Sequence, residues 1–293
     1  MSHFTDWKAI GAMLLIPLIW GIGFPLTHNA VSDVEPVVYI FGRYLIALLV
    51  ITPFALKFGI RISTKTLIAS VTIGVMQMGS AFFQAKALQT ISSAETAFCV
   101  CLSAAIIAVY EFCYYRRIPV GDAVAVVLSL LGVALMSGLY LNGLGIGYLY
   151  GLIAAFCISA AIIITGVLSR LLDVSRFTLV FWQLLAGTLI MSYWPVTHGL
   201  SGMFKMHVIV AVLFAGVFVS AVCLFIQVTW QRRITDTQTA LIFNMDLVFA
   251  SLFGLINGES ISVWQASGCV MMMLAISAAP VMQMLSKNKM SAQ

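Results

Sequence analysis

The chain has 293 residues, 62% of them hydrophobic and only 9% charged, and its mean hydropathy is +1.07. Soluble domains carry about 25% charged residues, so this composition excludes a water-surrounded globular protein and requires lipid. The net charge of +5 comes from basic residues that stand singly or in pairs between apolar runs, a layout that excludes a nucleic-acid-binding stripe.

Ten apolar runs follow one another along the chain, each near the length of about 20 residues that crosses a bilayer as a helix. They cover residues 9–29, 36–56, 66–87, 95–113, 121–140, 146–168, 176–195, 207–230, 237–257 and 263–284. The runs are continuous rather than alternating, which favours helices over strands. The sequence therefore predicts an all-α integral membrane protein with ten transmembrane helices.

The basic residues fall mostly on one side of the predicted bilayer. Segments on the side of the N-terminus hold 12 of the 15 lysines and arginines, whereas segments on the other side hold only Lys205. Cytoplasmic loops carry such an excess. We therefore expect a multi-pass protein of the inner (cytoplasmic) membrane with both termini in the cytoplasm.

The two halves of the chain resemble each other. At an offset of 140 residues, Phe41, Leu45 and Leu49 align with Phe181, Leu185 and Leu189, and at an offset of 143 Gln84 aligns with Gln227. We divide the chain into repeats at 1–141 and 142–293. Each repeat has five predicted helices, an odd number, so the second must be inverted relative to the first. Inverted repeats are typical of alternating-access carriers.

Several short motifs resemble those of a known family. The first run contains Trp20-Gly21-Ile22-Gly23-Phe24-Pro25, and the second contains Phe41-Gly42-Arg43-Tyr44-Leu45. The repeat partner of the second motif has Gln183 at the arginine position, and a third motif runs from Asp246 to Glu259. With these motifs, nearly the whole chain resembles the drug/metabolite transporter superfamily, in its ten-helix EamA branch.

The resemblance implies a secondary transporter rather than an enzyme, and by analogy it implies efflux. The chain departs from the family pattern at two positions, because Asp246 stands where proline is usual and Arg116 stands where glutamate is usual. These motifs are shared by carriers of many substrates. They identify the superfamily and leave the substrate open.

Arg43 is the first candidate site residue. It lies about eight residues into the second run, and an ionised side chain is costly in hydrocarbon unless it faces a cavity or a partner. One interpretation is an anchor for a substrate carboxylate or phosphate. The other is a structural cation bonded to carbonyls and helix ends.

Asp246 is the second candidate, near the middle of the ninth run. An intramembrane carboxylate indicates function by default, and we expect it to bind a substrate ammonium or to take up and release a proton. The alternative is a hydrogen bond to Asn244 or to a neighbouring helix. Glu111 is also deep, and for it an ion pair with Arg116 and Arg117 at the inner interface competes with a functional role.

Neutral side chains complete the predicted site. The symmetry-related amides of Gln84 and Gln227, together with Gln183, either hydrogen-bond a polar ligand or join helices. Trp20 and Trp182 stand beside motif positions, so we expect both to line a cavity, although aromatic residues also serve as core. The six cysteines form no metal-binding pattern, and no catalytic motif is present.

The sequence thus predicts a carrier, most plausibly an exporter, of a small polar metabolite such as an amino acid, working by alternating access around a midplane cavity. A nucleotide-like or cationic metabolite or drug is the alternative substrate, and a non-transporting membrane scaffold or sensor is the alternative class. We expect no cofactor and no metal. The fifth and tenth helices are expected to act as scaffold or to contact a second copy in a homodimer.

Overall fold

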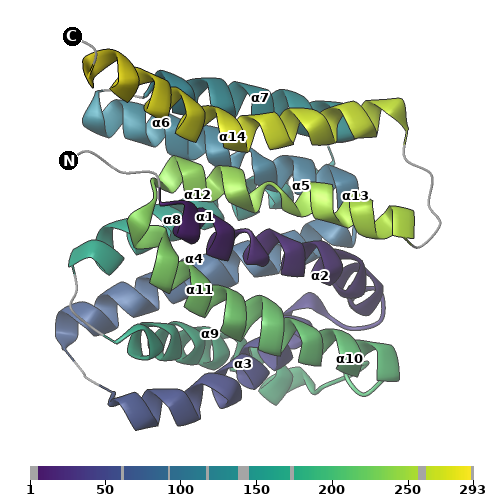
Figure 1. The fold of residues 1–293 in the computed structure, drawn as a ribbon. Helices are drawn as coiled ribbons and strands as arrows, with labels where there is room; N and C mark the ends of the chain where they lie inside the picture. The colour runs from purple at the N-terminus through teal and green to yellow at the C-terminus, as the bar shows by residue number, and fades with distance from the viewer. Residues whose placement is uncertain are drawn as a thin grey trace.

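The computed structural model describes residues 6–60, 63–91, 93–116, 119–137, 145–171, 175–256 and 262–291. Every element in these ranges is helical. The helices run roughly along one common direction, and the first described helix begins at the same end of the bundle at which the last one ends (Figure 1). We call this end the N-terminal end of the bundle, and the other the far end.

The described residues of the first half form seven helices. These are α1 (Trp7–Met13), α2 (Leu15–Val31), α3 (Pro36–Phe58), α4 (Thr64–Leu88), α5 (Ser93–Cys101), α6 (Ser103–Tyr115) and α7 (Val120–Ser137). Helices α1 and α2 follow each other directly, as do α5 and α6. Asp6 begins the bundle by accepting hydrogen bonds from the backbone N–H groups of Lys8 and Ala9, as an N-cap should.

The described residues of the second half form a more interrupted series of elements. Its elements are α8 (Ile146–Leu171), α9 (Arg176–His198), α10 (Met206–Phe214), the π-helix η1 (Ala215–Val222), α11 (Cys223–Trp230), the 3₁₀ turn η2 (Gln231–Arg233), α12 (Asp236–Phe243), α13 (Asp246–Ile256) and α14 (Val263–Ser291). A capping box between Thr235 and Gln238 starts α12.

Corresponding elements of the two halves keep a constant spacing. Helices α3 and α9 have 23 residues each, begin 140 residues apart, and end at the C-cap glycines Gly59 and Gly199, both with positive φ. Helices α6 and α13 begin 143 residues apart, each after a short break in the helix, at Leu102 and at Asn244–Met245. These are the two offsets found in the sequence alignment.

The packing pairs equivalent helices with each other. Helix α3 packs against α9, and α7 packs against α14 along one edge of the bundle (Figure 1). The contact of α4 with α9 has a counterpart in the contact of α3 with η1. This is the set of contacts that a two-fold axis relating the halves would produce.

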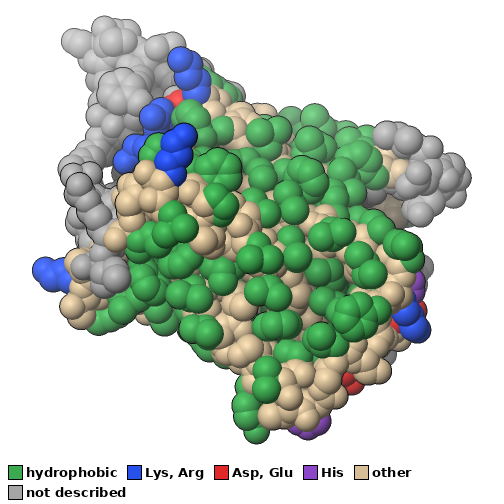
Figure 2. Space-filling view, turned by 90° about the horizontal axis from the view of Figure 1, so that it is seen from below, with side chains coloured by type: hydrophobic (Ala, Val, Ile, Leu, Met, Phe, Trp, Pro, Cys, Tyr) green, Lys and Arg blue, Asp and Glu red, His purple; other side chains and the backbone are tan. Residues whose placement is uncertain are grey.

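The outer surface fits a lipid environment. Large apolar side chains are exposed on α3 and α9, among them Leu49, Phe54, Leu189 and Tyr193. Figure 2 shows hydrophobic side chains over the middle of one face, with charged side chains gathered toward its ends. Within the described residues, seven helices are long and apolar enough to span a membrane, and two further apolar helices, Val120–Leu135 and Val263–Ala278, are shorter. A multi-pass helical membrane protein is thus confirmed, while the count of ten spans stays a prediction.

Candidate functional site

A cavity opens among α2, α3, α4, η1 and α11. Most of the side chains in its wall are apolar, and a few are polar. The lining residues are Trp20, Gly23, Phe24, Thr27, Arg43, Tyr44, Gln77, Ser80, Ala81, Gln84, Leu88, Val100, Ile158, Val219, Ser220 and Leu224. An apolar pocket with few convergent polar groups is the usual form of a small-molecule site.

Arg43 is the one cation among the described residues of this wall, and it is held from the second half of the chain. Its Nε donates a hydrogen bond to Ser220 Oγ at 2.6 Å. The backbones of α3 and η1 lie close together at this point. A Cβ added at Gly216 of η1 would lie 3.0 Å from the Arg43 carbonyl oxygen. No carboxylate of the described residues forms an ion pair with Arg43. The Nη1 and Nη2 donors of the guanidinium are therefore left for another partner.

Two other predicted residues, Trp20 and Gln84, also line the cavity. The Trp20 ring packs against Phe243 of α12 with 4.7 Å between ring centroids. Gln84 lies on α4, two turns from Gln77 on the same face of the helix, so that both amides reach the wall. Gln77 escaped the sequence analysis, although its spacing of seven residues from Gln84 was the signal that could have revealed it.

Beneath the cavity, three glutamines form a buried chain of amides, which we call the amide ladder. Gln77 Nε2 donates to Gln227 Oε1 at 2.9 Å, and Gln227 Nε2 donates to Gln231 Oε1 at 2.9 Å. Gln231 Nε2 donates in turn to the Ile162 carbonyl at 2.6 Å and to Asp236 Oδ1 at 3.3 Å. Gln227 is thus joined to the cavity through Gln77 rather than lining it. The ladder thus runs from Gln77 in the cavity wall to Gln231 and Asp236.

Trp182 and Gln183 lie on α9, outside the cavity wall. Gln183 is buried where α4 crosses α9. The two backbones lie close together there, since a Cβ added at Gly74 of α4 would be 2.5 Å from the Gln183 carbonyl oxygen. The side-chain amide of Gln183 and the Trp182 Nε1 have no hydrogen-bond partner in the structure. The structure therefore does not bring these two residues to Arg43.

Asp246 and Asn244 lie at the break between α12 and α13, also outside the cavity wall. Asn244 Nδ2 donates to Ser129 Oγ at 3.0 Å and to the Cys101 carbonyl at 3.3 Å. Asp246 Oδ1 accepts from the Leu247 N–H at 2.7 Å. Asp246 and Asn244 therefore do not bond to each other, as the sequence had suggested as an alternative. Asp246 bonds to the backbone at the start of α13, and Asn244 bonds to α5 and α7.

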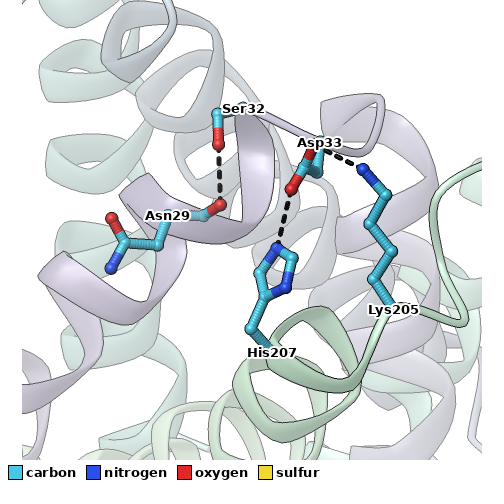
Figure 3. A network of polar contacts seen from close by, with 5 residues as sticks. All are labelled: Asn29, Ser32, Asp33, Lys205 and His207. Carbon is cyan, nitrogen blue, oxygen red and sulfur yellow. Dashed lines mark hydrogen bonds and ion pairs between the residues drawn. The ribbon is translucent and has the colours of Figure 1, made fainter.

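A cluster of charges joins the two halves at the far end of the bundle (Figure 3). Asp33, between α2 and α3, accepts from Lys205 Nζ at 2.5 Å and lies 2.9 Å from His207 Nε2. The hydrogen bond from Lys205 and the positive charge of that side chain lower the pKa of Asp33 below 3.8, and His207 acts in the same direction. Beside this cluster, Ser32 Oγ donates to the Asn29 carbonyl at 2.8 Å.

In the part of the chain that is described, no group of three or more His, Cys, Asp or Glu side chains is placed to hold a metal ion. The site as built can bind a small molecule through one guanidinium, amides, hydroxyls and aromatic faces. It holds no pair of groups arranged for nucleophilic or acid–base attack among the lining residues.

Comparisons with known proteins agree with a membrane carrier. An "Uncharacterized transporter" of Archaeoglobus fulgidus is 24% identical over 266 residues, which cover 90% of this chain and 83% of that protein. A protein of known crystal structure superposes with a TM-score of 0.78 over 95% of this chain and 98% of its own, at 16% identity, and therefore shares the fold. The model of the EamA-like transporter family matches twice, over residues 7–138 and 145–279. The chain therefore belongs to the EamA-like transporter family.

Proposed function

We propose that this transporter is a secondary carrier that moves a small polar metabolite bearing a carboxylate, such as an amino acid, through the cavity around Arg43. The observation that carries the proposal is the guanidinium in the cavity wall, hydrogen-bonded through Nε to Ser220 and paired with no carboxylate of the described residues. A partly buried guanidinium without an ionic partner attracts an anion, and a carboxylate accepts two parallel hydrogen bonds from it.

The remaining lining groups fit the rest of such a substrate. The aromatic faces of Trp20 and Phe24 suit an apolar side chain or an ammonium group. The amides of Gln77 and Gln84 supply both donors and acceptors. A cationic substrate, the alternative, would place a second positive charge beside Arg43 with no described acidic side chain in the wall to offset it. The geometry thus favours anions and zwitterions over cations.

Alternating access is proposed from the repeats. Residues 1–141 and 142–293 would be two inverted five-helix units that together make ten spans. The constant offsets of 140 and 143, the packing of α3 on α9 and of α7 on α14, and the double match of the family model support this division. The cavity takes residues from both units, as expected for a carrier that rocks about a central site.

The orientation and direction belong to the same proposal. The excess of lysine and arginine at the N-terminal end of the bundle supports an inner-membrane orientation with both termini in the cytoplasm. The cavity would then face outward, above the amide ladder. Efflux follows from the resemblance alone. The edge formed by α7 and α14 would serve as scaffold or as the contact with a second copy.

Vesicles containing the purified protein test this proposal. Labelled monocarboxylates, neutral amino acids, nucleotides and organic cations are offered in turn, and uptake is compared with that of empty vesicles. We expect saturable flux for at least one carboxylate or amino acid and none for organic cations. Flux of cations alone would overturn the assignment of Arg43, and flux of no compound in any class would overturn the carrier.

A further inference from the structure

Two buried carboxylates lie at the N-terminal end of the bundle, away from the cavity. Glu111, near the end of α6, is 9% exposed, and Asp122, in the first turn of α7, is 0% exposed. The Glu111 carboxylate interacts electrostatically with Asp122, so the two groups are near neighbours. Neither forms an ion pair with a described cation. The pairing of Glu111 with Arg116 expected from the sequence is absent, and Arg116 is exposed; Arg117 lies outside the described residues.

Glu111 accepts hydrogen bonds from the first turn of α12. Its Oε2 accepts from Thr237 Oγ1 at 2.7 Å, and its Oε1 accepts from the Thr237 N–H at 3.4 Å. The N-terminus of a helix carries a partial positive charge, which favours a carboxylate there. These contacts tie the Glu111 carboxylate to α12 without a cationic partner among the described residues.

Asp122 has no such support. Among the described residues, neither of its carboxylate oxygens has a hydrogen-bond partner, although both oxygens are fully buried. The elements packed against α7 are α5, α6, α12 and α14. Their described titratable side chains include no buried cation; they are Glu95, Cys99, Cys101, Tyr110, Glu111, Cys113, Tyr114, Asp236 and Cys269. For a carboxyl group that is buried, unbonded and beside a second carboxylate, the protonated form is favoured over the ionised form.

We propose that Glu111 and Asp122 form a proton-binding site, with the proton on Asp122 in the conformation observed. Release of the proton breaks the Asp122 O–H bond, leaves the electron pair on the carboxylate and transfers the proton to water. Since Asp122 is fully buried, this step requires the N-terminal end of the bundle to open and admit water. The site is distinct from Arg43 and the cavity.

The same contacts link the proton to movement of the two halves. The bonds from Thr237 to Glu111 join α12 to α6, one element from each proposed unit, directly beside Asp122. Once Asp122 has lost its proton, two neighbouring negative charges oppose reclosure of this end. Proton binding therefore favours the closed N-terminal end and the outward cavity. This coupling rests on the proposed carrier function, while the proton site itself does not.

Infrared difference spectroscopy of the protein in lipid tests the proton site without any substrate. Spectra are recorded between neutral and alkaline buffer for the native chain and for Asp122→Asn, an isosteric mimic of the protonated acid. We expect a carboxylic-acid carbonyl band at neutral pH that the variant lacks. Glu35→Gln, which changes an exposed acid, serves as the matched control and should keep the band. An unchanged band in a folded Asp122→Asn protein would overturn the site.

Transport driven by a pH gradient tests the coupling. Native protein should accumulate substrate in response to the gradient, whereas Asp122→Asn should retain exchange at equal pH and lose accumulation. Glu111→Gln provides a second variant, in which loss of the neighbouring charge should weaken the pH dependence. Asp246→Asn is the rival arm. Loss of accumulation in Asp246→Asn together with native behaviour of Asp122→Asn would assign coupling to Asp246 and overturn this inference.

If no compound is carried by the native protein, the infrared result still decides the proton site. Failure of the carrier proposal and failure of the proton site are therefore separate outcomes.

Discussion

At the scale of single residues, Arg43 carries the proposed substrate contact. Losing one partner of a buried, hydrogen-bonded charge pair costs about 2–5 kcal/mol, so we expect Arg43→Gln to raise the substrate Kd by about 30-fold or more. Arg43→Lys keeps the charge but not the paired donors, and its Kd should lie between those of the native protein and Arg43→Gln. Binding to purified protein, followed by substrate-induced shifts in melting temperature, measures this.

The control for this prediction is Lys86→Gln. Lys86 is a partly exposed cation near the far end of the bundle, 3.7 Å from Glu35 and outside the cavity wall. It should leave the Kd within about 2-fold of native, since a surface pair contributes about 1 kcal/mol at most. Native affinity in a well-folded Arg43→Gln protein would mean that Arg43 only joins α3 to η1 through Ser220.

Asp33 gives a prediction for pH. Its pKa is lowered in the folded protein, mainly by the hydrogen bond from Lys205, so its contribution to stability is present above pH 3.8 and is lost as the pH falls through the lowered value. Asp33→Asn should therefore melt at a slightly lower temperature than native protein at neutral pH. The difference should vanish in strong acid. A melting difference that grows on acidification would contradict the assigned ion pairs.

The residue-scale site was only partly accessible from the sequence. Arg43, Trp20 and Gln84 were predicted as site residues, and all three line the cavity. Polarity within an apolar run and the positions of the family motifs were the signals that indicated them. Trp182 and Asp246 were predicted by the same signals and lie elsewhere. Polarity within an apolar run says that a side chain needs partners, and only the packing decides whether these are a ligand or another helix.

At the scale of elements, the crossing of α4 and α9 depends on Gly74. A Cβ at this position would lie 2.5 Å from the Gln183 carbonyl oxygen and 2.8 Å from its Cα, both of them backbone atoms that cannot turn away. Overpacking of this kind costs about 1–3 kcal/mol. Gly74→Ala should therefore lower the melting temperature and the folded yield.

Gly11→Ala is the matched substitution, because a Cβ there meets nothing within 4 Å. In a helix alanine is favoured over glycine by about 1 kcal/mol, so this variant should melt at or slightly above the native temperature. Equal destabilisation of both variants would show that α4 and α9 are not held by this close approach.

The elements themselves were predicted well and their interruptions were not. Each predicted apolar run overlaps a helix or a set of consecutive helices, since hydrophobic length alone determines a span. The breaks at Leu102 and at Asn244–Met245, and the π-helix at Ala215–Val222, were missed. They leave backbone groups to be satisfied by side chains from other helices, as Asn244 does for Cys101, and such tertiary bonds have no local sequence signal.

At the scale of the whole molecule, the predicted topology places Ser201 outside and Lys65 inside. Both side chains are exposed. Ser201 follows the end of α9 at the far end of the bundle, and Lys65 lies in the first turn of α4 at the N-terminal end. On a cysteine-free background, Ser201→Cys should react with an impermeant thiol reagent in intact cells. Lys65→Cys should react only after permeabilisation. The reverse pattern would invert the orientation, and with it the direction of proton release.

The large-scale design was the most predictable part. Composition required a membrane, the two offsets indicated the repeat, and the family motifs agreed, because these signals are summed over many residues. A cavity was expected, but its shape could not be predicted, since that shape depends on how closely the two halves approach near Gly216 and Gly23.

Alternating access is the central claim, and the reactivity of two single cysteines tests it most directly. Ala81→Cys lies in the cavity wall, and Gln231→Cys lies in the buried amide ladder, 0% exposed in the native side chain. We predict that Ala81→Cys reacts from the outside and Gln231→Cys does not, and that conditions driving inward opening, an alkaline interior above all, reverse the two rates. Simultaneous reaction of both positions, or rates that never change in opposite directions, would contradict a carrier that opens to one side at a time.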